Sequence, residues 1–127
     1  MPVSYSIDVP RARVRTRCVG YTTLEETLVH FAALSQDPAC PPVADVLLDL
    51  VEVTSTPPPE KLRELARAAG SVPRVSFRHV AIIASRDALV GMMEMLRVYA
   101  QKAFAETAIF STPEEGEAWL DWMRDQA

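Results

Sequence analysis

The chain has 127 residues, of which 49% are hydrophobic and 24% charged, and its formal net charge is −4 at pH 7. This length suits one globular domain with a buried core, so a single domain over residues 1–127 is expected. The acidic balance disfavours a nucleic-acid-binding surface, because such binding depends on a concentrated positive field. Neither an apolar run long enough to cross a bilayer nor an export signal is evident, which predicts a cytoplasmic location without a transmembrane segment.

Two segments near the N-terminus alternate apolar and polar residues with the period of two that is typical of strands. They cover residues 3–9 and 11–19, with Pro10 between them, and predict a β-hairpin. One face of the second segment carries apolar or small residues, and the other carries a stripe of arginines. The arginine stripe consists of Arg11, Arg13, Arg15 and Arg17.

From residue 22 onward, helical periodicity alternates with short apolar runs. Thr22 or Thr23, each three residues before a glutamate, predicts the start of the first helix, and Ser85 is expected to cap the third. Thr112, three residues before Glu115, predicts the start of the last helix. The order is β-β-α-β-α-β-α-β-α. It predicts an α/β fold with a mixed sheet of about five strands, an antiparallel hairpin followed by three βα units, and four helices. The predicted helices cover 24–34, 60–69, 86–100 and 113–123, and the later strands cover 46–50, 79–84 and 107–110.

These elements resemble a known family. The runs VLLDL (46–50) and HVAIIA (79–84) and the C-terminal stretch AIFSTPEEGEAWL (108–120) are similar to the SpoIIAA-like branch of the STAS (Sec14-like) domains, over nearly the whole chain. The resemblance implies a sheet backed by helices and a non-enzymatic module. Members of the wider group are phosphorylation-switched partners of anti-sigma factors or kinases, or hold lipids and other small anions.

The chain departs from this family at the phosphoacceptor serine. The matching positions are Pro57 and Pro58, which cannot accept a phosphoryl group. The hydroxyls of Thr54 to Thr56 lie two to four residues earlier and offer an alternative target without a motif. The phosphorylation switch is therefore not expected in its usual form.

Hydroxyl side chains follow three predicted strands and precede three predicted helices. In a parallel sheet they gather at the carboxyl edge, where α/β proteins bind ligands, and helix N-termini there favour anions. Ordinary helix capping explains the same serines and threonines, so a ligand or partner site and a capping role both remain open. The candidates are Thr54, Ser55, Thr56, Ser85, Arg86, Ser111 and Thr112.

The arginine stripe also has two interpretations, both of which place it on an exposed or edge face of the hairpin. Its guanidinium groups, spaced by about 7 Å along the strand, suit bidentate contacts to phosphates or other anions. Charged residues equally keep an edge strand from pairing with a neighbour, and this protective role is favoured. Aromatic residues do not interleave with the arginines, which further disfavours single-stranded nucleic acid.

Residues with catalytic or metal-binding potential are isolated in the sequence. His30 is expected on the polar side of its helix and His79 at the start of a strand, and neither has a nucleophile motif nearby. Cys18 and Cys40 lack metal-ligand spacing and are expected to be buried thiols. Asp49, within an apolar run, is expected to have a structural role. We therefore expect no enzyme, no metal and no cofactor.

Two functions of different kinds remain. The first is a protein-interaction or regulatory module, with a protein partner and a homodimer as ways to cover the apolar helix 86–100. The alternative is a carrier or sensor of a lipid or small anionic ligand, with that helix as a wall and the three polar loops as the mouth. A carrier requires an apolar cavity of about 300 Å³ or more, whereas an interaction module requires an exposed patch and no cavity.

Overall fold

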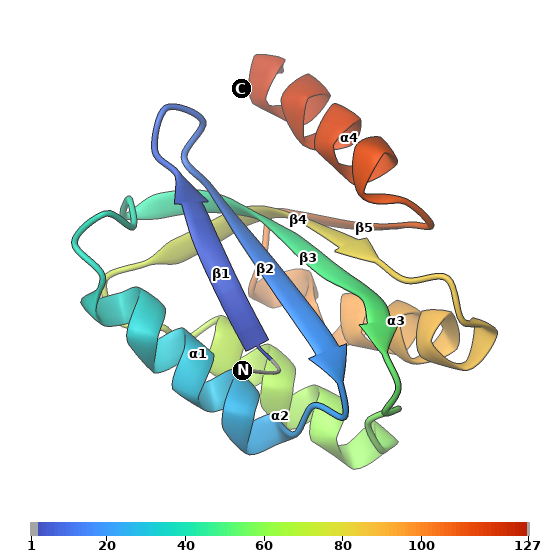
Figure 1. The fold of residues 1–127 in the computed structure, drawn as a ribbon. Helices are drawn as coiled ribbons and strands as arrows, with labels where there is room; N and C mark the ends of the chain where they lie inside the picture. The colour runs from blue at the N-terminus through green and yellow to red at the C-terminus, as the bar shows by residue number, and fades with distance from the viewer. Residues whose placement is uncertain (1–2, 127) are drawn as a thin grey trace.

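A computed structural model describes residues 3–126, which form one five-stranded sheet and four α-helices (Figure 1). The strand order is β1-β2-β3-β4-β5, in which β1 and β2 are antiparallel and all other neighbours are parallel. The predicted α/β fold with a mixed sheet is confirmed. The strands are β1 (Val3–Asp8), β2 (Arg13–Gly20), β3 (Val43–Val53), β4 (Ser76–Ile83) and β5 (Glu106–Phe110), and the helices are α1 (Leu24–Gln36), α2 (Pro59–Ala69), α3 (Asp87–Tyr99) and α4 (Pro113–Asp125), with a 3₁₀ turn η1 (Ala100–Lys102) after α3.

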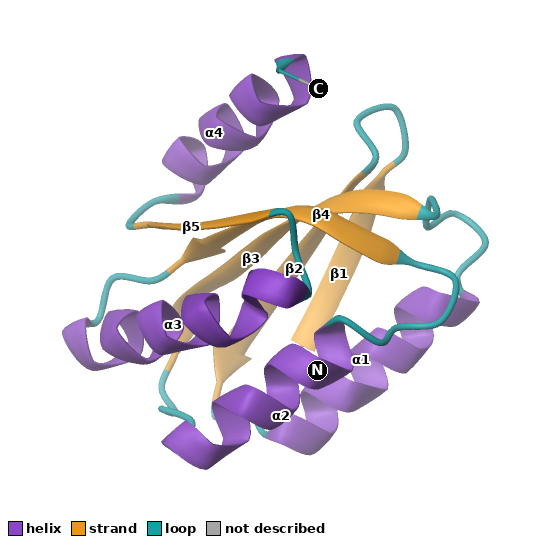
Figure 2. Ribbon diagram, turned by 180° about the vertical axis from the view of Figure 1, so that it is seen from behind, coloured by secondary structure: helices purple, strands orange, loops and turns teal. Residues whose placement is uncertain are grey.

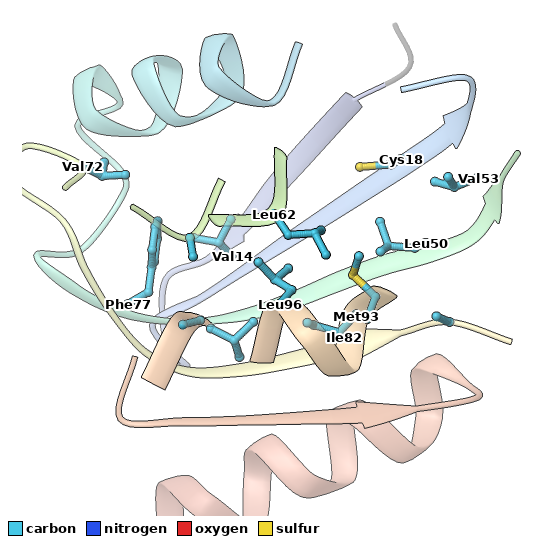
Figure 3. Packing of buried hydrophobic residues seen from close by; sticks show 14 of the residues in the cluster. Val14, Cys18, Leu50, Val53, Leu62, Val72, Phe77, Ile82, Met93 and Leu96 are labelled. Atoms are coloured by element: carbon cyan, nitrogen blue, oxygen red, sulfur yellow. The ribbon is translucent and has the colours of Figure 1, made fainter. Parts of the chain in front are cut away.

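The helices divide unequally between the two faces of the sheet. Helices α1, α2 and α3 cover one face, and α4 lies on the opposite face, as Figures 1 and 2 show from two sides. The larger hydrophobic core lies under the three helices (Figure 3), and a smaller cluster around Leu47 and Leu120 lies under α4. Within residues 3–126, none of the helices has the length and apolar character needed to cross a bilayer.

The helix starts confirm two of the capping predictions and correct a third. Thr23 and Glu26 form a complete capping box at α1, and Thr112 accepts the backbone N–H of Glu115 at α4. The prediction that Ser85 caps α3 is wrong, because the chain stays extended for one more residue and Arg86 occupies the N-cap.

Helix α4 approaches the sheet closely. A Cβ atom at Gly116 would lie 2.5 Å from a buried side chain of β4, so glycine permits this contact. Leu120 is fully buried, and the ring of Trp119 packs against Phe110 with centroids 5.7 Å apart. Trp122, the other tryptophan of α4, is 58% exposed and does not hold the helix in this way.

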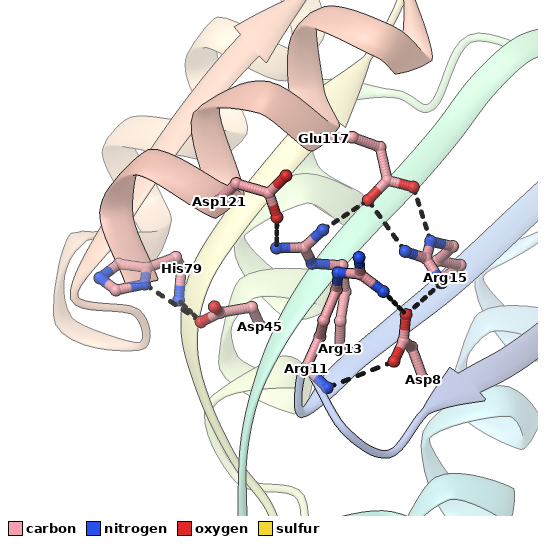
Figure 4. Close-up of polar contacts among 8 residues, drawn as sticks. All are labelled: Asp8, Arg11, Arg13, Arg15, Asp45, His79, Glu117 and Asp121. Atoms are coloured by element: carbon pink, nitrogen blue, oxygen red, sulfur yellow. Dashed lines mark hydrogen bonds and ion pairs between the residues drawn. The ribbon is translucent and has the colours of Figure 1, made fainter. Parts of the chain in front are cut away.

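The arginine stripe does not protect an edge, and that interpretation is wrong. Strand β2 pairs with β1 on one side and with β3 on the other, so its backbone groups need no protection. Arg13 is 1% exposed, because α4 crosses over it (Figure 4). Its Nη1 donates to Glu117 Oε1 (2.7 Å) and its Nη2 to Asp121 Oδ1 (2.8 Å), so the guanidinium joins the sheet to α4 through two carboxylates.

The other three arginines also face carboxylates. Arg15 Nε donates to Glu117 Oε2 at 2.6 Å, and Arg15 Nη1 lies 3.1 Å from Asp8 Oδ2. Burial alone would raise the pKa of Glu117, but hydrogen bonds from Arg15 and Arg13 hold this pKa below its usual value. Arg11 lies in the turn before β2 and pairs with Asp8, while Arg17 forms an exposed pair with Glu52. Each predicted anion-contact residue therefore has an acidic partner within the chain.

Replacing Arg13 tests whether this network holds α4. Arg13→Gln leaves two carboxylates without their buried partner, and we expect the free energy of unfolding to fall by about 3 kcal/mol. Arg17→Gln, in the same strand but in an exposed pair, is the matched control and should change it by no more than about 0.5 kcal/mol. Urea denaturation of the two variants gives the comparison, and equal effects would show that Arg13 does not anchor the helix.

Candidate functional site

A cavity of about 380 Å³ lies between the sheet and helices α1, α2 and α3. Its volume falls within the range of small-molecule pockets. The deeper walls are apolar, and several of their side chains are drawn in Figure 3. The main apolar wall residues are Val46, Leu48, Leu50 and Ile82 from the sheet, Leu34 from α1, Leu65 and Ala66 from α2, and Leu89, Met93 and Leu96 from α3.

The middle of strand β3 shows that this space is not filled by protein. Val46 and Leu48 face the helix layer, yet both are only half-buried. Val14, the neighbour of Val46 across the β2–β3 pairing, is fully buried and does not line the cavity. Two valines at the same level of the sheet therefore differ in their surroundings, because one packs against protein and the other borders the cavity.

Small side chains leave this space open. Thr16 and Cys18 occupy inward positions of β2, and Ala66 and Ala69 face the sheet from α2. Ala100 continues the pattern after α3. Leucine or phenylalanine at these positions would fill the core, whereas a truncated side chain in a packed interior leaves a void when its neighbours cannot collapse onto it.

A neutral histidine contributes a polar group to the cavity wall. His30 is 9% exposed, and its Nε2 lies 3.1 Å from the hydroxyl of Thr16. The rings of Tyr5 and Phe31 flank the imidazole. Burial lowers the pKa of His30 to about 4, so the ring is uncharged at pH 7. The prediction that His30 lies on the polar side of α1 is wrong. This helix is apolar around most of its circumference, so its hydrophobic periodicity does not indicate which side faces the core.

The two free cysteines differ in burial. Cys18 is buried, as predicted, and lines the cavity. Burial raises the pKa of Cys18 to about 11, which keeps the thiol protonated at neutral pH. Cys40 is only half-buried and does not line the cavity.

The mouth of the cavity lies between the β2–α1 loop and the β3–α2 loop. Ser55 Oγ accepts the backbone N–H of Thr22 (3.1 Å) and donates to the Thr22 carbonyl (3.2 Å), which joins the two loops. Arg86 supports the second loop, because its Nη2 donates to the Ser55 carbonyl at 2.9 Å. The mouth residues are Tyr21, Thr22, Thr23 and Glu25 from the first loop and the start of α1, and Ser55, Thr56, Pro57, Pro58 and Lys61 from the second loop and the start of α2.

The candidate site residues at the strand ends separate into three groups. Ser55, Thr56 and Arg86 come together at the mouth, where Arg86 Nη2 also lies 3.4 Å from Thr56 Oγ1. Thr54 and Ser85 are exposed, and neither lines the cavity. The hydroxyls of Ser111 and Thr112 bond to Glu115 at the start of α4, on the opposite side of the sheet.

The buried carboxylate of the sheet is Asp45, which the sequence analysis missed. Asp45 is 0% exposed and accepts the backbone N–H of His79 at 3.1 Å, and His79 Nδ1 lies 3.1 Å from the same oxygen (Figure 4). Asp49, singled out from the sequence, is half-buried and accepts the N–H of Val51. Among residues 3–126, no three histidine, cysteine or acidic side chains group as a metal site.

Comparisons with known proteins identify no relative. The chain matches no protein-family model, no curated protein and no solved structure. The cavity and its mouth are therefore the features of the molecule that indicate a function.

Filling the cavity should cost little stability. Val46→Phe places a ring in empty space, so we expect the free energy of unfolding to change by less than about 1 kcal/mol. Val14→Phe overpacks a filled core, so it should lower the free energy of unfolding by about 1–3 kcal/mol. Chemical denaturation measures both variants. Equal losses would mean that no usable space borders Val46.

His30 should make stability depend on pH. Because its folded pKa of about 4 lies below the unfolded value of 6.5, the unfolded chain binds more protons between these values, and stability is lost as pH falls through this window. From pH 7 to pH 5 the wild type should lose about 2 kcal/mol more than His30→Gln. Urea denaturation at each pH gives the difference, and parallel losses in the two proteins would contradict the assignment.

Proposed function

We propose that this protein binds and carries a small, largely apolar molecule in the cavity beneath α1, α2 and α3, and that it acts by binding rather than by catalysis. The observation that carries the proposal is an apolar cavity of about 380 Å³ whose mouth is polar. A void of this kind is costly when empty, because its lining side chains lack contacts on one side. A ligand that restores those contacts stabilises the folded protein.

The cavity supports the carrier over the interaction module. The two hypotheses require different structures. An interaction module requires an exposed patch and no cavity, whereas a carrier requires a cavity of more than about 300 Å³. The carrier expected from the sequence is matched in part, because Thr54, Ser85, Ser111 and Thr112 do not line the cavity. Met93 and Leu96 of α3 form part of a wall, and Ser55 and Thr56 lie at the mouth.

The resemblance to the STAS (Sec14-like) domains fits the same proposal. It rests on the order of elements, and members of the wider group hold lipids. Pro57 and Pro58, at the positions that match the phosphoacceptor, line the mouth of the cavity. We therefore favour ligand binding over a phosphorylation switch as the activity of this chain.

A neutral fluorescent probe tests the proposal. N-phenyl-1-naphthylamine, whose emission rises in apolar surroundings, should bind the wild type and bind Val46→Phe at least tenfold more weakly, because the introduced ring occupies the site. Ala66→Leu fills the same space from α2 and should act alike. Val51→Phe makes the same change as Val46→Phe on the opposite, exposed side of β3 and is the matched control.

Two outcomes would contradict the carrier. One is wild-type protein that leaves the probe emission unchanged, and the other is equal binding by the wild type and both filled variants. Native mass spectrometry of protein purified from its own host complements the titration, because an adduct that disappears on denaturation gives the mass of the natural ligand.

A further inference from the structure

We propose that the ligand is an uncharged molecule with an apolar body and one hydrogen-bonding group, such as a long-chain alcohol, and that this group meets the hydroxyl of Thr22 at the mouth of the cavity. The inference rests on the proposed function and defines the chemical class of the ligand. It replaces the small anion considered from the sequence.

The interior offers no partner for a charge. Apart from the mouth residues, the described polar lining groups are the hydroxyls of Thr16, Thr27 and Thr107, the thiol of Cys18 and the imidazole of His30, all of them neutral at pH 7. The charged lining residues are Glu25 and Lys61, which are both exposed at the mouth. Because burying an ion without a counter-charge is strongly unfavourable, a carboxylate or ammonium group would be excluded from this space.

The side-chain charges at the mouth do not attract anions either. Glu25 and Lys61 carry opposite charges, and Lys61 lies 3.9 Å from Glu64. The guanidinium of Arg86 already donates to the carbonyl of Ser55. Glu60, in the first turn of α2 beside Lys61, adds a further negative charge. These side chains therefore give no net positive charge around the opening, and the positive ends of α1 and α2 are the remaining attraction for an acidic head group.

Thr22 supplies the one polar group at the mouth that is buried and unused. Its backbone N–H and carbonyl are both bonded to Ser55, which fixes the residue in place. Its Oγ1 is buried and has no hydrogen-bond partner among residues 3–126. A buried hydroxyl in this state costs free energy. Because Thr22 lines the cavity, rotation about its Cα–Cβ bond would turn the hydroxyl toward a ligand hydroxyl or carbonyl, with which it can both donate and accept.

Ligands of equal chain length and different charge test the inference. Displacement of N-phenyl-1-naphthylamine is measured at pH 8 with 1-decanol, decanoate and decyltrimethylammonium. We expect the inhibition constant of 1-decanol to be at least tenfold lower than those of the two ions. Thr22→Val should weaken 1-decanol binding three- to tenfold more than it weakens probe binding, whereas Thr54→Val, in the other loop and outside the cavity, should change neither.

The outcomes separate the inference from the proposed function. Binding of decanoate as tight as that of 1-decanol would overturn the uncharged class and leave the carrier standing. Unchanged 1-decanol binding by folded Thr22→Val would overturn the role of Thr22. If neither the probe nor any of the three ligands binds, the carrier itself is wrong. The comparison of ligands uses the wild type, so it decides the charge question even if Thr22→Val does not fold.

Discussion

The structure depends on the buried guanidinium of Arg13. Two carboxylates of α4 compensate its charge, and this pairing holds the helix against a face of the sheet that would otherwise meet water. With α4 in place, Leu47, Ala81 and Ile83 form a second core, so β3 and β4 are covered on both sides. The central strands are thus fixed without help from a fully packed layer of helices on the opposite face.

That arrangement allows the two faces of the sheet to differ. Under α4 the packing is so close that a glycine is required, whereas under the other three helices small residues such as Cys18, Ala66 and Ala100 leave space. A void in a core lowers stability, and binding sites commonly trade stability for function. The second core and its ion pairs offset this loss, so the molecule can keep an open interior and still fold.

The sequence predicts the elements well, because hydrophobic period and helix capping are local properties. It does not predict which element covers each face of a strand in which apolar and polar residues alternate. Arg13 meets Glu117, 104 residues away, and only the path of α4 makes that arginine interior. The direction in which His30 points could not be predicted, because α1 has apolar residues on most sides. The hydrophobic periodicity of the sequence does not predict the cavity, because a cavity forms where side chains are too small to fill the interior. The small residues at inward positions are the sequence feature that corresponds to it.

The link between Ser55 and Thr22 has a consequence for the timing of ligand exchange. Ser55 joins the two loops at the mouth by two hydrogen bonds from its side chain, and the neighbouring backbone N–H of Thr54 donates to the carbonyl of Gly20. Local opening of such a contact requires much less free energy than global unfolding. In the proposed carrier, a bound molecule would therefore leave while the sheet remains intact, and its residence time would be set by the separation of two loops rather than by the stability of the fold.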